Sequence, residues 1–297
     1  MTATISVTGL TRRYRNHLAL HDVTFDIEGP SITGLLGRNG AGKTTLLRIV
    51  AAQERPSAGQ VLVLGASPIE NDAILRRMVF VREDQVFPDF TVGHALKVAS
   101  WFYPNWSGEL AETLTGEFDL PTDRAIKRLS RGMRSALSIV IGLAARAEVT
   151  LFDEPYAGLD AVARQLFYDR LLVEYAEHPR TVLLSTHLIN EVAGLLERVV
   201  MIDRGRVILD AAADDIRGAF TTVSGPTTAV EELVAGRPTW DRRQIASQES
   251  VVVGALDDGD RIRARDLHLS VESLSLQQVM VHASGRAAEE PQERTSA

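Results

Sequence analysis

The chain has 297 residues, of which 39 are acidic and 32 are lysine or arginine, so its formal net charge is −7. Hydrophobic residues make up 45% and charged residues 24% of the sequence, which is ordinary for a folded protein and excludes a wholly disordered chain. The absence of cysteine excludes a disulfide scaffold, a thiolate zinc site and a cysteine nucleophile. The acidic balance argues against a nucleic-acid partner, because nucleic acids favour a basic face.

The sequence carries no signal for membrane insertion. No apolar run reaches the ~18–20 residues that a membrane-spanning helix requires. The first residues lack the basic and apolar stretches of a signal peptide. We therefore expect a cytoplasmic protein that reaches a membrane only through a partner.

Short β-rich runs alternate with helical stretches from residue 5 to about residue 220. Strands are predicted over residues 23–27, 32–36, 61–64, 78–81, 149–152, 182–185, 199–202 and 207–209, and helices over 43–52, 92–102, 109–118, 132–146, 161–176 and 189–196. This alternation predicts an α/β domain with a largely parallel central sheet. The runs at 150–152 and 182–184 are apolar on both faces, as buried parallel strands require.

The composition changes after residue 220. Residues 221–228 are rich in Ser, Thr, Gly and Pro, which predicts a linker. Beyond it we predict a small α/β extension over residues 229–283, with a helix over 229–234, strands over 250–253 and 261–264, and a helix over 276–282. Residues 284–297 have almost no apolar content and are predicted to be a disordered tail.

A glycine-rich motif follows the predicted strand 32–36 and opens the helix that begins at residue 43. Residues 37–44 read Gly-Arg-Asn-Gly-Ala-Gly-Lys-Thr, which matches the pattern G-x-x-x-x-G-K-[ST]. Its glycines let backbone N–H groups converge on one anion, and the positive end of the helix adds to the attraction. Lys43 supplies a point charge for the β- and γ-phosphates, and Thr44 offers a hydroxyl to Mg²⁺. The motif therefore predicts a nucleotide-phosphate site.

Two adjacent acids end the apolar strand predicted over 149–152. Asp153 and Glu154 would be costly at the end of a buried strand unless they faced a cation or a reacting water. We expect Asp153 to hold the Mg²⁺ shell, and Glu154 to orient and polarise the water that attacks the γ-phosphate.

A third motif completes a family resemblance. Residues 129–133 read Leu-Ser-Arg-Gly-Met and resemble the signature, usually LSGGQ, of the ATP-binding subunits of ABC transporters. The resemblance covers about residues 5–220 and implies an ABC-type P-loop ATPase over residues 1–220, with a mostly parallel core sheet, an antiparallel β part and a helical insert at about residues 86–145. Arg131 and Met133 depart from the usual Gly and Gln, and similar variants occur in bacterial multidrug and antibiotic exporter subunits.

The resemblance implies a head-to-tail dimer, made of two identical subunits or of this chain and a homologue. In that dimer Ser130 and Gly132 of one subunit close on the ATP that the other subunit holds, and residues 158–160 (Gly-Leu-Asp) form the loop that communicates across the interface. The loop residues implied to bind ATP are Gly37, Arg38, Asn39, Gly40, Ala41, Gly42, Lys43, Thr44 and Thr45.

Three further positions follow the family's order of motifs. Tyr14 lies where the family places an aromatic ring that stacks on adenine, although a half-buried strand tyrosine would look the same. His187, after the predicted strand 182–185, resembles the switch histidine that contacts the γ-phosphate. The glutamine that links Mg²⁺ to the transporter should follow strand 78–81: spacing places Arg82 or Glu83 there, whereas chemistry favours Gln85.

The implied function is to bind and hydrolyse ATP with Mg²⁺, and so to power a separate integral membrane permease from the inner face of the cell membrane. The implied cargo is an exported drug, antibiotic or lipid-like compound. Aromatic residues between positions 87 and 106 either receive a helix of this permease or form the insert's own core. Two alternatives stay open: an ATP-binding regulatory partner in a heteromeric complex, and a soluble ABC ATPase without a transport role. The resemblance leaves two roles open for the C-terminal extension: regulation of the dimer, or extension of its interface.

Overall fold

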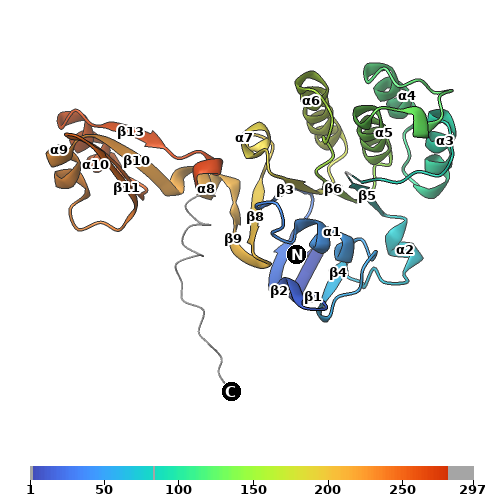
Figure 1. The fold of residues 1–297 in the computed structure, drawn as a ribbon, viewed down its shortest axis with the longest axis horizontal. Helices are drawn as coiled ribbons and strands as arrows, with labels where there is room; N and C mark the ends of the chain where they lie inside the picture. Colours follow the sequence, from blue (N-terminus) through green and yellow to red (C-terminus); the bar gives the residue numbers. More distant parts are fainter. Residues whose placement is uncertain (1–2, 83, 280–297) are drawn as a thin grey trace. The chain divides into compact units, whose positions relative to one another are not determined.

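The computed structural model describes residues 3–82 and 84–279 (Figure 1). They divide into two compact units. The first comprises the described residues up to Leu188 together with Leu195–Asp210, and the second comprises Ile189–Gly194 and the described residues from Ala211 onward. Within the described ranges, no helix combines the length and the apolar character that crossing a bilayer requires.

A six-stranded sheet forms the centre of the first unit, in the order β5-β6-β7-β3-β8-β9. Its strands are β3 (Ser31–Leu36), β5 (Met78–Arg82), β6 (Val149–Asp153), β7 (Thr181–Thr186), β8 (Arg198–Asp203) and β9 (Arg206–Ala212). In this sheet order, each pair of neighbouring strands from β5 through β6, β7 and β3 to β8 is parallel. All residues of β3, β6 and β7 are buried, as strands covered on both faces must be.

A separate antiparallel sheet has the order β2-β1-β4. Its strands are β1 (Ile5–Tyr14), β2 (His17–Ile27) and β4 (Ala58–Val63). Strand β1 is absent from the sequence prediction because its alternation breaks between Val7 and Leu10, where the register shifts and Gly9 adopts φ 60°. Beyond that bulge Leu10 is again fully buried and joins the core.

Several helices of the first unit begin at a residue whose side chain caps the helix. The helices of this unit are α1 (Lys43–Val50), α2 (Asp72–Leu75), α3 (Val92–Phe102), α4 (Gly108–Glu117), the 3₁₀ turn η1 (Ile126–Arg128), α5 (Arg131–Ala144) and α6 (Ala161–Glu177). Side chains of Thr91, Ser107, Ser130 and Asp160 cap α3, α4, α5 and α6, respectively. The predicted helix over 189–196 is shorter, since α7 (Ile189–Val192) ends before Gly194.

The central sheet packs a different helix on each face. Leu46 and Leu47 of α1 share a buried cluster with Leu151 of β6. On the other face, Gly142 of α5 lies so close to Phe152 that an added Cβ would stand 3.1 Å from its ring. Consecutive residues of β6 therefore face opposite helix layers, as the two-residue repeat of a strand dictates.

The second unit contains a four-stranded antiparallel sheet in the order β11-β12-β10-β13. After α8 (Ala213–Ala219) come β10 (Phe220–Pro226), α9 (Thr227–Val234), β11 (Thr239–Ile245), β12 (Gln248–Gly254), α10 (Asp258–Asp266) and β13 (Ser270–Ser273). This is the split β-α-β-β-α-β arrangement. Its core joins Val230 and Leu233 of α9 and Ala264 of α10 to Val223 and Val251 of the sheet.

Two sequence predictions in this region are wrong. The predicted linker 221–228 is strand β10 and the start of α9, because Thr221 and Val223 alternate inward within the polar composition. The predicted strand 261–264 lies inside α10, where a capping box formed by Asp257 and Asp260 starts a helix. Residues 276–279 are helical as predicted, and the remainder of that segment and the predicted tail 284–297 lie outside the described residues.

Candidate active site

Three neighbouring parallel strands end at the same edge of the central sheet. The glycine-rich loop follows β3, Asp153 and Glu154 close β6, and Thr186 and His187 close β7. Because β6, β7 and β3 are adjacent and parallel, their carboxyl ends bring these segments together. In open α/β sheets this edge is where ligands bind.

The glycine-rich loop runs from Gly37 to the start of α1 in a conformation that only glycine permits at key positions. Gly42 has φ 112°, and a Cβ there would lie 2.7 Å from the carbonyl oxygen of Ala19. A Cβ on Gly37 would lie 2.3 Å from the carbonyl oxygen of Ile202. The two glycines therefore let the loop pack closely against neighbouring backbone and lead into the amino end of α1, a position that suits an anion such as a nucleotide phosphate.

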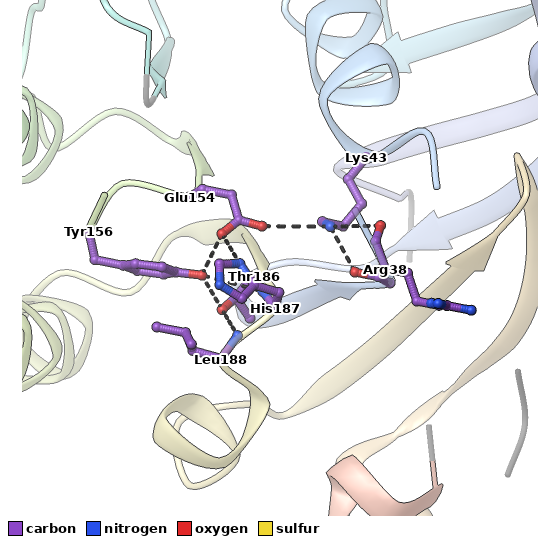
Figure 2. A network of polar contacts seen from close by, with 8 residues as sticks. Arg38, Lys43, Glu154, Tyr156, Thr186, His187 and Leu188 are labelled. Carbon is purple, nitrogen blue, oxygen red and sulfur yellow. Dashed lines mark hydrogen bonds and ion pairs between the residues drawn. The ribbon is translucent and has the colours of Figure 1, made fainter. Parts of the chain in front are cut away.

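Lys43 is the cation of this loop. Its side chain is only 6% exposed, and its Nζ donates hydrogen bonds to the carbonyl oxygens of Gly37 at 2.8 Å and Arg38 at 3.3 Å (Figure 2). The same atom lies 3.6 Å from Oε1 of Glu154. The lysine of the first motif and the second acid of the other motif therefore share one site.

Asp153 is buried beside Thr44, the residue that follows Lys43. Burial raises the pKa of its carboxyl, and the nearby hydroxyls of Thr44 and Ser185 oppose that shift. Among the described residues, its Oδ1 has no hydrogen-bond partner. A buried carboxylate oxygen without a partner, next to a threonine hydroxyl, is the hard oxygen donor set that Mg²⁺ prefers, so these residues fit that ion.

Glu154 stands at the centre of a polar network shown in Figure 2. Its backbone adopts φ 49°, a left-handed conformation that is uncommon for a residue with a Cβ. Its carboxylate contacts Lys43, accepts a hydrogen bond from the hydroxyl of Tyr156 at 2.8 Å, and lies 2.5 Å from Nδ1 of His187. The glutamate side chain is 14% exposed and the histidine 48% exposed, so the network opens to solvent on the histidine side.

Tyr156 is a member of this network that the sequence analysis missed. Its hydroxyl also contacts Oγ1 of Thr186 and accepts a hydrogen bond from the backbone N–H of His187 at 3.3 Å. The signal in the sequence was a residue with a phenolic hydroxyl two positions after Glu154, between the acid pair and the Gly-Leu-Asp loop. Only the fold shows that this hydroxyl turns back toward the end of β7.

The signature residues form a second group at the amino end of α5. Ser130 is exposed, and its side chain accepts a hydrogen bond from the backbone N–H of Met133 at 3.1 Å, so it caps the helix. A Cβ on Gly132 would lie 2.5 Å from the carbonyl oxygen of Gly158. Ser135 donates to the carbonyl oxygen of Ala157 at 2.6 Å. The signature helix therefore packs directly on the segment that follows Glu154 and Tyr156.

Two predicted residues have surroundings of their own, apart from the network around Glu154. Tyr14 ends β1; its hydroxyl donates a hydrogen bond to Glu54, and the guanidinium of Arg12 lies 4.5 Å from the centre of its ring. Gln85 follows β5, and its Oε1 is buried without a hydrogen-bond partner among the described residues. Arg82 ends β5 and donates a hydrogen bond to Gln53, whereas Glu83 lies outside the described residues.

The fold and the loop define a P-loop nucleotide-binding protein, and comparisons with known proteins narrow this class. The family model described as ABC transporter matches residues 20–157. The Nod factor export ATP-binding protein I of Ralstonia nicotianae is 34% identical over 215 residues, which cover 70% of this chain and 66% of that protein. The doxorubicin resistance ATP-binding protein DrrA of Mycobacterium tuberculosis is 30% identical over 223 residues, which cover 72% of this chain and 67% of that protein.

A solved structure shares the fold. It is the dimeric post-hydrolysis state of the ATP-binding cassette MJ0796 with ADP and phosphate, with a TM-score of 0.62 and 22% sequence identity over 70% of this chain and 98% of that one. The chain belongs to the ABC transporter family and is one of its ATP-binding proteins, a class of ATPases. The predicted family and fold class are confirmed. The match spans 66% of the length of the Nod factor relative.

Proposed function

We propose that this chain hydrolyses ATP to power a separate integral membrane permease, and that the complex exports a drug, antibiotic or lipid-like compound. The observation that carries the first part is the convergence of Lys43, Glu154 and His187, in which one carboxylate lies 3.6 Å from the lysine and 2.5 Å from the histidine. A phosphate-binding cation next to a carboxylate that can orient water suits γ-phosphate hydrolysis. The names of the two relatives, which concern export and drug resistance, support the second part.

Each residue of the site has a proposed role in this reaction. The loop from Gly37 to Thr45 holds the phosphates, with Lys43 at the β- and γ-phosphates. Thr44, Asp153 and Gln85 hold Mg²⁺, which neutralises charge on the phosphates when it is bound.

The remaining proposed contacts are with the attacking water, the γ-phosphate and the adenine base of ATP. Glu154 orients and polarises the attacking water, and His187 contacts the γ-phosphate. Tyr14 receives the adenine on the ring face opposite Arg12, which already covers one side of the ring.

We further propose that two copies, or this chain and a homologue, form a head-to-tail dimer. Ser130 and Gly132 lie at the amino end of the 14-residue helix α5, a position that attracts anions. Because the loop at Lys43 already forms one phosphate site, this second one serves the ATP of the opposite subunit. The dimeric state of the MJ0796 cassette supports this arrangement.

The helical insert is the proposed contact with the permease. Trp101 and Phe102 at the end of α3 are 66% and 59% exposed, whereas Tyr103 and Trp106 are partly buried. The exposed pair suits a partner helix, because aromatic rings are enriched in protein interfaces. In this proposal the chain lies on the cytoplasmic face of the membrane and has no nucleic-acid partner.

Two measurements test the proposed function. The purified chain should release phosphate from ATP in a magnesium-dependent manner, and an affinity-tagged chain should co-purify with an integral membrane protein from its native membranes. Binding of ATP without turnover would instead favour a regulatory partner in a heteromeric complex. Turnover with no membrane partner would favour a soluble ABC ATPase.

A further inference from the structure

The hydroxyl of Tyr156 contacts both strand ends of the site. Tyr156 is 4% exposed and follows Glu154 by two positions. Its oxygen contacts Oε2 of Glu154 beyond the end of β6, and both Thr186 and the backbone N–H of His187 at the end of β7 (Figure 2). The two strand ends also meet directly, because Oε2 of Glu154 lies 2.5 Å from Nδ1 of His187.

The direction of each hydrogen bond follows from the number of protons. A phenol has one proton to donate and two lone pairs that accept. An ionised Glu154 only accepts and the backbone N–H of His187 only donates, so Tyr156 gives its proton to Glu154. Thr186 then donates to Tyr156, while its own oxygen accepts from the backbone N–H of Leu188 at 2.9 Å. Burial raises the pKa of Tyr156, so the phenol keeps the proton that it donates.

This arrangement stabilises a backbone conformation at Glu154 that is otherwise unfavourable. The left-handed conformation of Glu154 needs support from its surroundings. Two backbone hydrogen bonds supply part of this support. The N–H of Glu154 donates to the carbonyl oxygen of Ser185 at 3.2 Å, and the N–H of Ala157 donates to the backbone carbonyl oxygen of Glu154 at 3.2 Å. The phenol adds a contact to the carboxylate itself: together with Nδ1 of His187 it holds Oε2, while Oε1 faces Lys43.

We propose that Tyr156 is a positioning residue for hydrolysis: its hydroxyl orients the carboxylate of Glu154 and aligns it with the turn that carries His187. This inference rests on the proposed ATPase function. The phenol acts through Glu154 and His187 and leaves the phosphate loop unchanged, so its loss lowers turnover and spares the binding of ATP. A 1 Å error in the position of a catalytic group is costly even when binding is intact.

The test compares Tyr156→Phe with wild type and with a matched control. The variant keeps the buried ring and removes all three hydroxyl contacts. Tyr175→Phe is the control, because it also removes a hydroxyl that faces a carboxylate, that of Glu197, elsewhere on the first unit. We expect Tyr156→Phe to lower kcat about tenfold, the effect of losing one hydrogen bond to a charged group, with the KM and Kd for ATP within about twofold of wild type. Tyr175→Phe should keep the wild-type kcat.

A double variant shows whether Tyr156 acts through Glu154. On a Glu154→Gln background, adding Tyr156→Phe should change the residual turnover by less than about twofold, because non-additive effects mark residues that act as a unit. The inference is overturned if Tyr156→Phe keeps wild-type kcat, if its KM rises as much as its kcat falls, or if its effect is the same in both backgrounds. An inactive wild-type chain would instead refute the proposed function, and the two failures are therefore distinguishable.

Discussion

The two regions proposed to bind nucleotide differ in how completely they are built. The phosphate loop and its acids are enclosed: Lys43 is 6% exposed, Glu154 is 14% exposed, and each already contacts the other. The signature at the amino end of α5 is open, with Ser130 and Arg131 exposed and the serine capping its own helix. One region is preorganised within a single chain, whereas the other presents a helix end outward. The difference fits a protein that completes its chemistry only when a second subunit faces it.

Replacing Lys43 should have the largest effect, because it removes the only side-chain cation that contacts the carbonyl groups of the phosphate loop among the described residues. Lys43→Ala should lower turnover by at least about a hundredfold, the usual loss when one such electrostatic contact is deleted. It should also abolish measurable ATP binding in a fluorescent-nucleotide titration. Lys97→Ala changes an exposed lysine and should match wild type. Normal ATPase activity in Lys43→Ala would refute the loop as the phosphate site.

Replacing Glu154 should separate binding from turnover within the enclosed region. Glu154→Gln keeps the shape of the side chain but removes its charge, so turnover should fall about 10²- to 10⁴-fold while ATP still binds. In the presence of ATP a closed dimer should then accumulate, which light scattering after size-exclusion chromatography measures. Glu148→Gln, on the exposed residue that precedes β6 and pairs with Arg77, serves as the control. A Glu154→Gln chain that stays monomeric with ATP, when wild type dimerises, would count against the dimer.

Gly132→Ala probes the open region with a smaller change. Its Cβ would stand 2.5 Å from the carbonyl oxygen of Gly158, so the helix end or the loop must shift. We expect about a tenfold loss of turnover, with ATP binding to the isolated chain unchanged. The matched control is Gly108→Ala at the start of α4, where a Cβ meets nothing within 4 Å. Equal losses of ATP binding and turnover in Gly132→Ala would place the signature in the chain's own site.

The smallest effect on ATP turnover should come from the core of the second unit. Leu233→Ala empties a buried position that packs with Val223 and Val251, and should lower the stability of that unit by about 2–5 kcal/mol. Because none of the proposed site residues belongs to this core, kcat should stay within about twofold of wild type. Calorimetry and ATPase assays below the unfolding transition measure the two effects. A parallel loss of activity would show that the second unit supports the catalytic one.

The sequence was most informative where local chemistry restricts the residue types. The phosphate loop and the acid pair could be identified because glycine, lysine and paired acids at such spacings have few other uses, and helix α3 starts and ends as predicted. The polar strand β10 was mistaken for a linker because its inward positions carry Thr221 as well as Val223. Tyr156 could not be found because its role depends on contacts with Thr186 and His187, about thirty residues away on another strand.

The central claim is that the open signature of one chain completes the enclosed site of another. The sequence has no cysteine, so a single introduced cysteine is the only thiol in the chain that can react with a crosslinker. An Asn39→Cys chain and a Ser130→Cys chain, both on the Glu154→Gln background, can be mixed and treated with a short bis-maleimide, because both positions are exposed. The account predicts a crosslinked dimer that requires both variants together and forms only with ATP. The contradicting result is no crosslink with ATP, or an equal yield from the Ser130→Cys chain alone.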